Sequence, residues 1–199
     1  MSGGRGIRTA LLVLALVLSG VAVATAPDND TIVGAIPTTA AIGDEAATRQ
    51  FAATVNEVRL ADALDISYGD GGFRVVNTVL PSDGVWVVVD LSLTARYSSV
   101  LLQYSELHIG GIVYRASNLL PSPAVSESRA GPGIEVRGPL AFEIPTDIAE
   151  SDAAAHAVIV LQAELNPQVE GVTHHPVDLG ALERDPTAVL SGARIGGTS

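Results

Sequence analysis

The sequence predicts an all-β domain, built as a two-sheet antiparallel sandwich behind one N-terminal transmembrane helix. Two observations carry the prediction of the sandwich. Several short stretches rich in β-branched residues are separated by turn signals, and residues 50–182 have almost no helical periodicity. A small β-barrel is the alternative architecture for the same pattern.

The segment from Gly84 to Arg96 is predicted to be the central strand. It follows a turn signal, Pro81–Gly84, and its first half is apolar at every position. Trp86 is expected to be the largest side chain of the core or its rim. The second half alternates, with Val87, Val89, Leu91 and Leu93 on one face and Asp90, Ser92 and Thr94 on the other.

The other strands are predicted from shorter runs of the same kind. Gly110-Gly111 is predicted to be the turn of a hairpin, Pro139 to mark a bulge or a sheet edge, and residues 146–150 to form one helical turn. The predicted strands are 54–61, 73–79, 101–107, 112–116, 134–144, 155–165 and a short edge strand at 175–179.

The N-terminal region predicts export. Residues 1–8 contain Arg5 and Arg8, and residues 9–26 form an uncharged apolar run. At about 1.5 Å per residue, that run makes a helix long enough to cross a thin bilayer, with its N-terminus in the cytoplasm. We expect a signal anchor in the cell membrane with the domain outside the cytoplasm; the alternative is a signal peptide cleaved near Thr25, which would release a secreted protein.

The sequence divides the rest of the chain into three parts. Residues 27–49 are small and polar without clear periodicity, and they are predicted to be a flexible linker. Residues 50–182 are predicted to be the sandwich. Residues 183–199 contain Gly and Pro without a period, so we expect a disordered tail.

Composition excludes several classes of function. The net charge is −11 and there is no lysine, so a nucleic-acid partner is not expected, because few cations are present to neutralise phosphates. The absence of cysteine excludes disulfides, thiolate catalysis and Cys-based metal sites. No phosphate-binding loop, dinucleotide fingerprint or Gly-x-Ser-x-Gly motif is present, so we expect neither a cofactor nor an enzyme.

One cluster contains metal-ligand residue types: His174, His175 and Asp178. Adjacent residues of a strand point to opposite faces, so the two histidines do not easily bind one ion. We interpret them as histidines of a surface loop, and a metal site is the weaker alternative.

A long loop is predicted from Asn118 to Gly133, and long loops on a rigid scaffold often carry binding sites. Its apolar residues Leu119, Leu120 and Val125 have two alternative roles. Either they face a partner, or they close one end of the sandwich, which is the preferred interpretation.

With these strands in place, the domain resembles a family of exported immunoglobulin-like domains of unknown function that is common in actinobacteria. The resemblance covers about residues 53–180. It rests on Val55–Ala61, Gly84–Ala95, the Gly-Gly hairpin with Tyr114–Ala116, and Gly138–Pro145. It implies an immunoglobulin-like β-sandwich after one membrane segment, and it implies no catalytic residues.

The sequence therefore predicts a non-enzymatic, membrane-anchored extracytoplasmic domain that serves protein interaction or is an accessory subunit of an envelope complex. Its expected partners are the membrane, through residues 9–26, and another envelope protein. The alternative is a cleaved, secreted module that binds a small ligand or a glycan.

Overall fold

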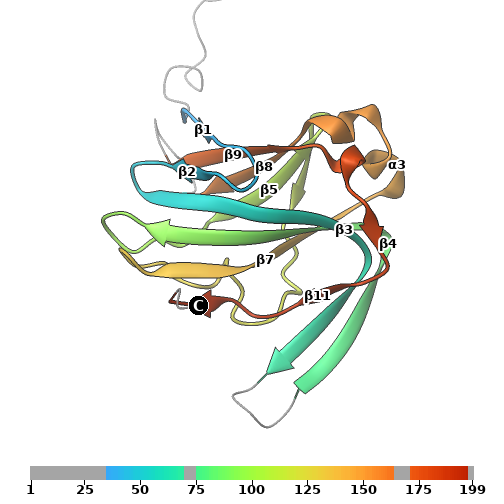
Figure 1. The fold of residues 1–199 in the computed structure, drawn as a ribbon, viewed down its shortest axis with the longest axis horizontal. Coiled ribbons are helices and arrows are strands. Elements are labelled where there is room, and N and C mark those ends of the chain that lie inside the picture. Colours follow the sequence, from blue (N-terminus) through green and yellow to red (C-terminus); the bar gives the residue numbers. More distant parts are fainter. Residues whose placement is uncertain (1–34, 70–74, 164–170, 197–199) are drawn as a thin grey trace, which may run out of the picture. The chain divides into compact units, whose positions relative to one another are not determined.

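The computed structural model describes residues 35–69, 75–163 and 171–196, and it confirms the two-sheet β-sandwich (Figure 1). The predicted transmembrane helix at 9–26 lies outside these residues. Within the described ranges, no helix has the length and apolar character needed to span a membrane.

The first sheet is formed around a long hairpin, β3 (Phe51–Gly69) and β4 (Val75–Ala95), which pairs with β7 (Glu135–Ile144). Its strand order is β10-β3-β4-β7-β12, and β2 and β11 also pair with β3. The four short strands are β2 (Glu45–Ala47), β10 (Arg184–Asp185), β11 (Ala188–Leu190) and β12 (Arg194–Ile195).

The second sheet has the order β1-β9-β8-β5-β6. Most pairs in both sheets are antiparallel, but β1 joins β9, and β10 and β11 join β3, in parallel. The strands of the second sheet are β1 (Thr38–Thr39), β5 (Tyr104–Ile109), β6 (Ile112–Arg115), β8 (Ala157–Gln162) and β9 (Val172–Val177).

The structure confirms that β4 is central. Val87, Val89, Leu91 and Leu93 are fully buried between the sheets, where they join the main core with residues such as Phe142 and Leu161. Trp86 and Val88 point to the opposite face and belong to a second buried cluster with Leu64, Leu120 and Leu190. Both faces of this half-strand are covered, which explains its unbroken apolar sequence.

The predicted turn at Pro81–Gly84 is wrong, because β4 continues through it. Ala61 pairs with Trp86 but Ala63 pairs with Pro81, so the turn residues bulge out of the ladder without ending the strand. A Cβ on Gly84 would lie 2.1 Å from the carbonyl oxygen of Ile144, so only glycine allows this close approach. The predicted strand at 73–79 and the central strand are therefore parts of one strand, β4, and the predicted strand at 54–61 lies in its hairpin partner, β3.

The linker and tail boundaries also change. Residues 38–39 and 45–47 pair with the two sheets, although they fall in the predicted linker at 27–49. Three strands form within the predicted tail at 183–199, where Ala188 and Leu190 are buried. Short strands at sheet edges lack a measurable period, so their pairing is visible only in the folded chain.

The structure agrees with the predictions for the Gly-Gly turn, for Pro139 and for the helical turn at 146–150. Ile109 pairs with Ile112 across Gly110-Gly111, and both glycines have positive φ, as a two-residue hairpin turn requires. Pro139 lies in β7 beyond the two residues that pair with β12, which agrees with an edge position. Three short helical segments follow: α3 (Thr146–Ala149), η1 (Asp152–His156) and η2 (Leu179–Ala181).

Candidate functional site

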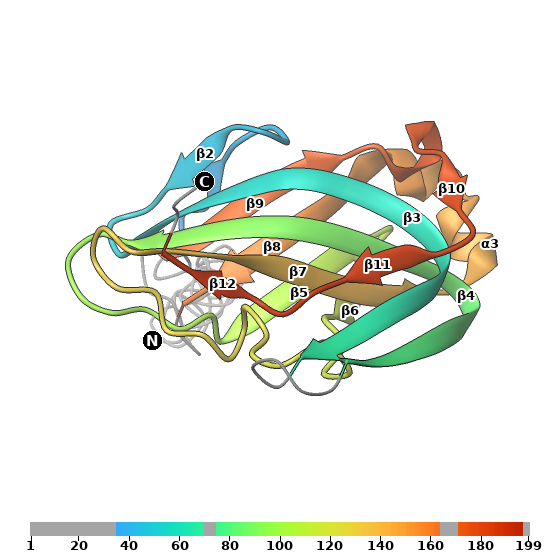
Figure 2. The same cartoon turned by 60° about the horizontal axis from the view of Figure 1, so that its bottom comes forward.

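The candidate site is a groove on the outer face of the first sheet. Residues 184–195, which we call the C-terminal strap, start on the edge of β3 and end on the edge of β7. Between those edges the strap crosses the outer face of the sheet (Figure 2). The space between strap and sheet has a volume of about 370 Å³, and we call it the outer groove.

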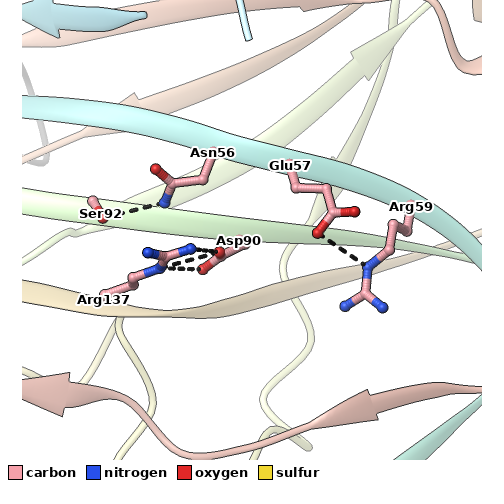
Figure 3. A network of polar contacts seen from close by, with 6 residues as sticks. All are labelled: Asn56, Glu57, Arg59, Asp90, Ser92 and Arg137. Atoms are coloured by element: carbon pink, nitrogen blue, oxygen red, sulfur yellow. Dashed lines mark hydrogen bonds and ion pairs between the residues drawn. The ribbon is translucent and has the colours of Figure 1, made fainter. Parts of the chain in front are cut away.

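The base of the outer groove contains a bidentate ion pair between neighbouring strands. Arg137 Nε of β7 donates to both carboxylate oxygens of Asp90 of β4, at 3.3 and 3.1 Å, and Nη2 donates to Oδ2 (Figure 3). The hydrogen bond and the charge of Asp90 raise the pKa of Arg137 above its usual value. This fork geometry holds Asp90 as an acceptor on a half-exposed surface.

A second, looser pair lies on β3. Arg59 Nε is 3.7 Å from Glu57 Oε2, which is too long for a hydrogen bond. Glu57 faces the groove because Asn56 is an extra residue in β3, between the pairs Val55–Leu91 and Glu57–Asp90. The amide of Asn56 donates to Ser92 Oγ at 3.1 Å beside the groove (Figure 3).

The strap adds a third guanidinium. Arg194 of β12 lies directly opposite Arg137 in an antiparallel pair, and both residues line the outer groove. Among the described residues, the Arg194 side chain has no hydrogen bond or ion pair. Asp90 pairs with Arg137 and leaves Arg194 without a carboxylate, so this corner of the groove has an excess of positive charge and of hydrogen-bond donors. Like charges in directly opposite positions also destabilise the strand pair.

The strap is held close to the sheet by small residues. A Cβ on Gly138 would lie 2.9 Å from the Cα and Cβ atoms of Ala193, so the contact depends on glycine. Ala193 N also donates to the carbonyl oxygen of Pro123 at 2.7 Å. At the other end, Arg184 pairs with Asp62 and donates to the carbonyl oxygen of Gly84 at 2.8 Å.

The predicted histidine cluster is not brought together. His174 and His175 belong to β9 and point to opposite faces, as strand geometry requires. Asp178 instead accepts a hydrogen bond from Ala181 N at the start of η2. Within the described residues, no group of three or more His, Asp or Glu side chains is placed to hold a metal ion.

The interpretation of His175 as a surface loop residue is wrong. Its side chain is fully buried on the inner face of β9, and neither ring nitrogen has a partner in the described part of the chain. Burial, with a smaller contribution from His174, lowers its pKa to about 4. Burial and nearby His108 also lower the pKa of His174. β1 pairs with β9 only at Thr173 and His174, so residues 175–177 of the predicted edge strand lie at the edge of the sheet, but the strand begins earlier than predicted, at Val172.

The apolar loop residues divide between the two predicted roles. Val125 is buried in the main core between the sheets, whereas Leu120 is buried in the second cluster, on the outer face of the first sheet. Leu119 is 52% exposed. The role of this loop in binding a partner therefore stays a prediction.

Sequence reasoning missed the outer groove. One part of its signal was present, because Asp90 falls on the polar face of the alternating half of β4. The missing part was the position of residues 189–194, which lie far along the chain and have no period.

Comparisons with known proteins add little. No family model and no curated protein matches this sequence. Among solved structures, the chain is similar to an uncharacterized β-sandwich protein from Clostridium difficile 630, with 13% identity and a TM-score of 0.45 over 71% of this chain and 95% of the other. Membership of the actinobacterial family therefore stays a prediction.

Proposed function

We propose that this chain is a non-enzymatic, membrane-anchored extracytoplasmic domain that recognises another envelope protein through the outer groove and the C-terminal strap. The anchor is assigned to residues 9–26 on their sequence. The observation that carries the recognition role is the outer groove, where charged side chains from three strands and the strap converge.

The composition of this surface fits recognition. Val189 and Ile195 are 63% and 61% exposed on the strap, on either side of Arg194. Arginine is enriched in protein interfaces, and the buried centre of an interface is more apolar than the rest of the surface. The groove carboxylate of Asp90 is occupied by Arg137, an arrangement that suits a fixed recognition surface better than proton transfer.

The order of strands supports the immunoglobulin-like assignment. β3, β4 and β7 correspond to strands A, B and E of such a sandwich, and β9-β8-β5-β6 corresponds to the order G-F-C-C′. Loops and faces of this architecture commonly serve binding, but the fold alone does not name a partner.

The recognition role is tested with a photo-crosslinking amino acid placed at Val189 or Ile195 of the full-length chain in membranes of the native host. We expect a discrete crosslinked product from these positions. Tyr97, which is 75% exposed outside the groove, is the matched control and should give none. Crosslinking from Tyr97 alone would place the contact elsewhere.

The anchor is tested separately by fractionation and intact-mass analysis. A full-length species in the membrane fraction is expected. A species that starts near Thr25 in the medium would contradict the anchor and favour the secreted alternative.

A further inference from the structure

We propose that the outer groove binds a carboxylate group, held by the guanidinium of Arg194, with Arg59 as a further cation of the same groove. The inference deepens the recognition role proposed above and rests on it. The supporting observation is a set of arginine N–H donors in the groove that have no acceptor among the described residues.

The groove has more cationic donors than acceptors. Its lining contains Arg59, Arg137 and Arg194 but only two carboxylates, Glu57 and Asp90. Asp90 accepts from Arg137 in a fork, and Glu57 is too far from Arg59 for a hydrogen bond. Each guanidinium has five N–H donors, so most donors of Arg59 and Arg194 remain open to a ligand.

The strand pairing gives a reason for an anion at this place. Arg194 and Arg137 are direct neighbours on one face of the β7–β12 pair, and their like charges repel. The carboxylate of Asp90 is paired with Arg137, and no described carboxylate is paired with Arg194. An anion beside Arg194 relieves the repulsion and forms charge-assisted hydrogen bonds.

The groove favours a singly charged, planar anion. Glu57 and Asp90 line the same space and repel a dianion more strongly than a carboxylate. A carboxylate also matches the fork geometry of arginine. Next to these charges lies the exposed Val189, which offers contact for an apolar part of the ligand.

Two sources present this chemistry: the terminal or side-chain carboxylate of a peptide, and the carboxylate of a sugar acid. N-acetyl-L-leucine represents the first and D-galacturonate the second. N-acetyl-L-leucinamide has the same apolar body without the charge, and inorganic phosphate represents the dianion.

The test is an NMR titration of the full-length chain in detergent micelles, following the backbone amides of residues 189–194. We expect saturable shifts with at least one carboxylate, weaker effects with phosphate, and none with the amide. Whichever carboxylate binds more tightly identifies the source. Binding should weaken as salt rises, because both cations are partly exposed.

Variants identify the residues that hold the ligand. Arg194→Gln should weaken carboxylate binding by about tenfold or more, and Arg59→Gln should weaken it less, because two strands separate Arg59 from β12. Arg129→Gln is the matched control, because Arg129 is exposed and does not line the groove, and it should leave binding unchanged. Thermal unfolding of all three variants checks that they remain folded.

Equal binding of the amide and the carboxylate, tighter binding of phosphate, or full affinity in Arg194→Gln would overturn the inference. If no probe binds while the Ile195 crosslink persists, the carboxylate inference fails and the recognition role stands. If the crosslink is absent while the probes bind through Arg194, the proposal of a protein partner is contradicted and the carboxylate site is supported.

Discussion

The two faces of the β3–β4–β7 sheet are made from alternate residues of the same strands, yet they differ in what covers them. The inner face is apolar from Val85 to Ala95 of β4, and it packs on the second sheet. The outer face is apolar at Trp86 and Val88, under the strap, and polar from Asp90 onward. The difference teaches that alternation reports burial at each position but does not identify the element that provides it.

The largest expected effect is on the inner face. Leu91→Ala removes a fully buried side chain from the main core and leaves a cavity between two sheets that cannot easily close. We expect the free energy of unfolding to fall by about 4 kcal/mol. Denaturant unfolding at pH 7 measures this change, and a loss under about 1 kcal/mol would contradict the close packing of the sheets.

The matched change on the outer face is Leu190→Ala, which truncates the same side chain in the smaller cluster. A strap held by three short strands relaxes more readily than a sheet, so we expect a loss of about 2 kcal/mol. In Leu190→Ala, the rate of amide hydrogen exchange relative to the parent chain should increase more in residues 184–195 than in β8. Equal losses from both leucine variants would remove the distinction between the two faces.

The third expected effect comes from His175 on the inner face of the other sheet. Its pKa is about 4 in the folded chain and about 6.5 when unfolded, so between these values the unfolded chain binds the extra proton. The free energy of unfolding should therefore fall as pH drops from 7 to 4.5, by on the order of 2 kcal/mol from this group.

His175→Leu tests the pH dependence because it removes the titrating group. Its stability should decrease less between pH 7 and pH 4.5 than that of the parent chain. His156→Leu is the matched control, since His156 is exposed, and it should keep the parent slope. Identical slopes in the parent chain and His175→Leu would show that His175 is not the source.

The smallest effect is expected at the ion pair of the outer groove. Asp90→Asn weakens the bond to Arg137, but both side chains are partly exposed, at 28% and 54%. We expect a loss of only about 0.5 kcal/mol, decreasing at high salt. Urea unfolding at two salt concentrations measures it. A loss above about 2 kcal/mol would mean that this face contributes to stability as the inner face does.

The sequence by itself determined the class of fold and the position of its central strand. β-branched runs, the Gly-Gly turn and the alternation after Trp86 depend on neighbouring residues, and local pattern reports them directly. The same holds for the opposite orientations of His174 and His175, which follow from strand geometry alone.

Only the tertiary structure decided what lies against each strand. The strap, the bulge at Pro81–Gly84 and the burial of His175 depend on pairings between residues far apart in sequence. Short edge strands bury too few residues to leave a periodic signal, so residues 184–195 looked like a tail. The outer groove exists because that segment returns across the sheet, and no local pattern encodes where a chain returns.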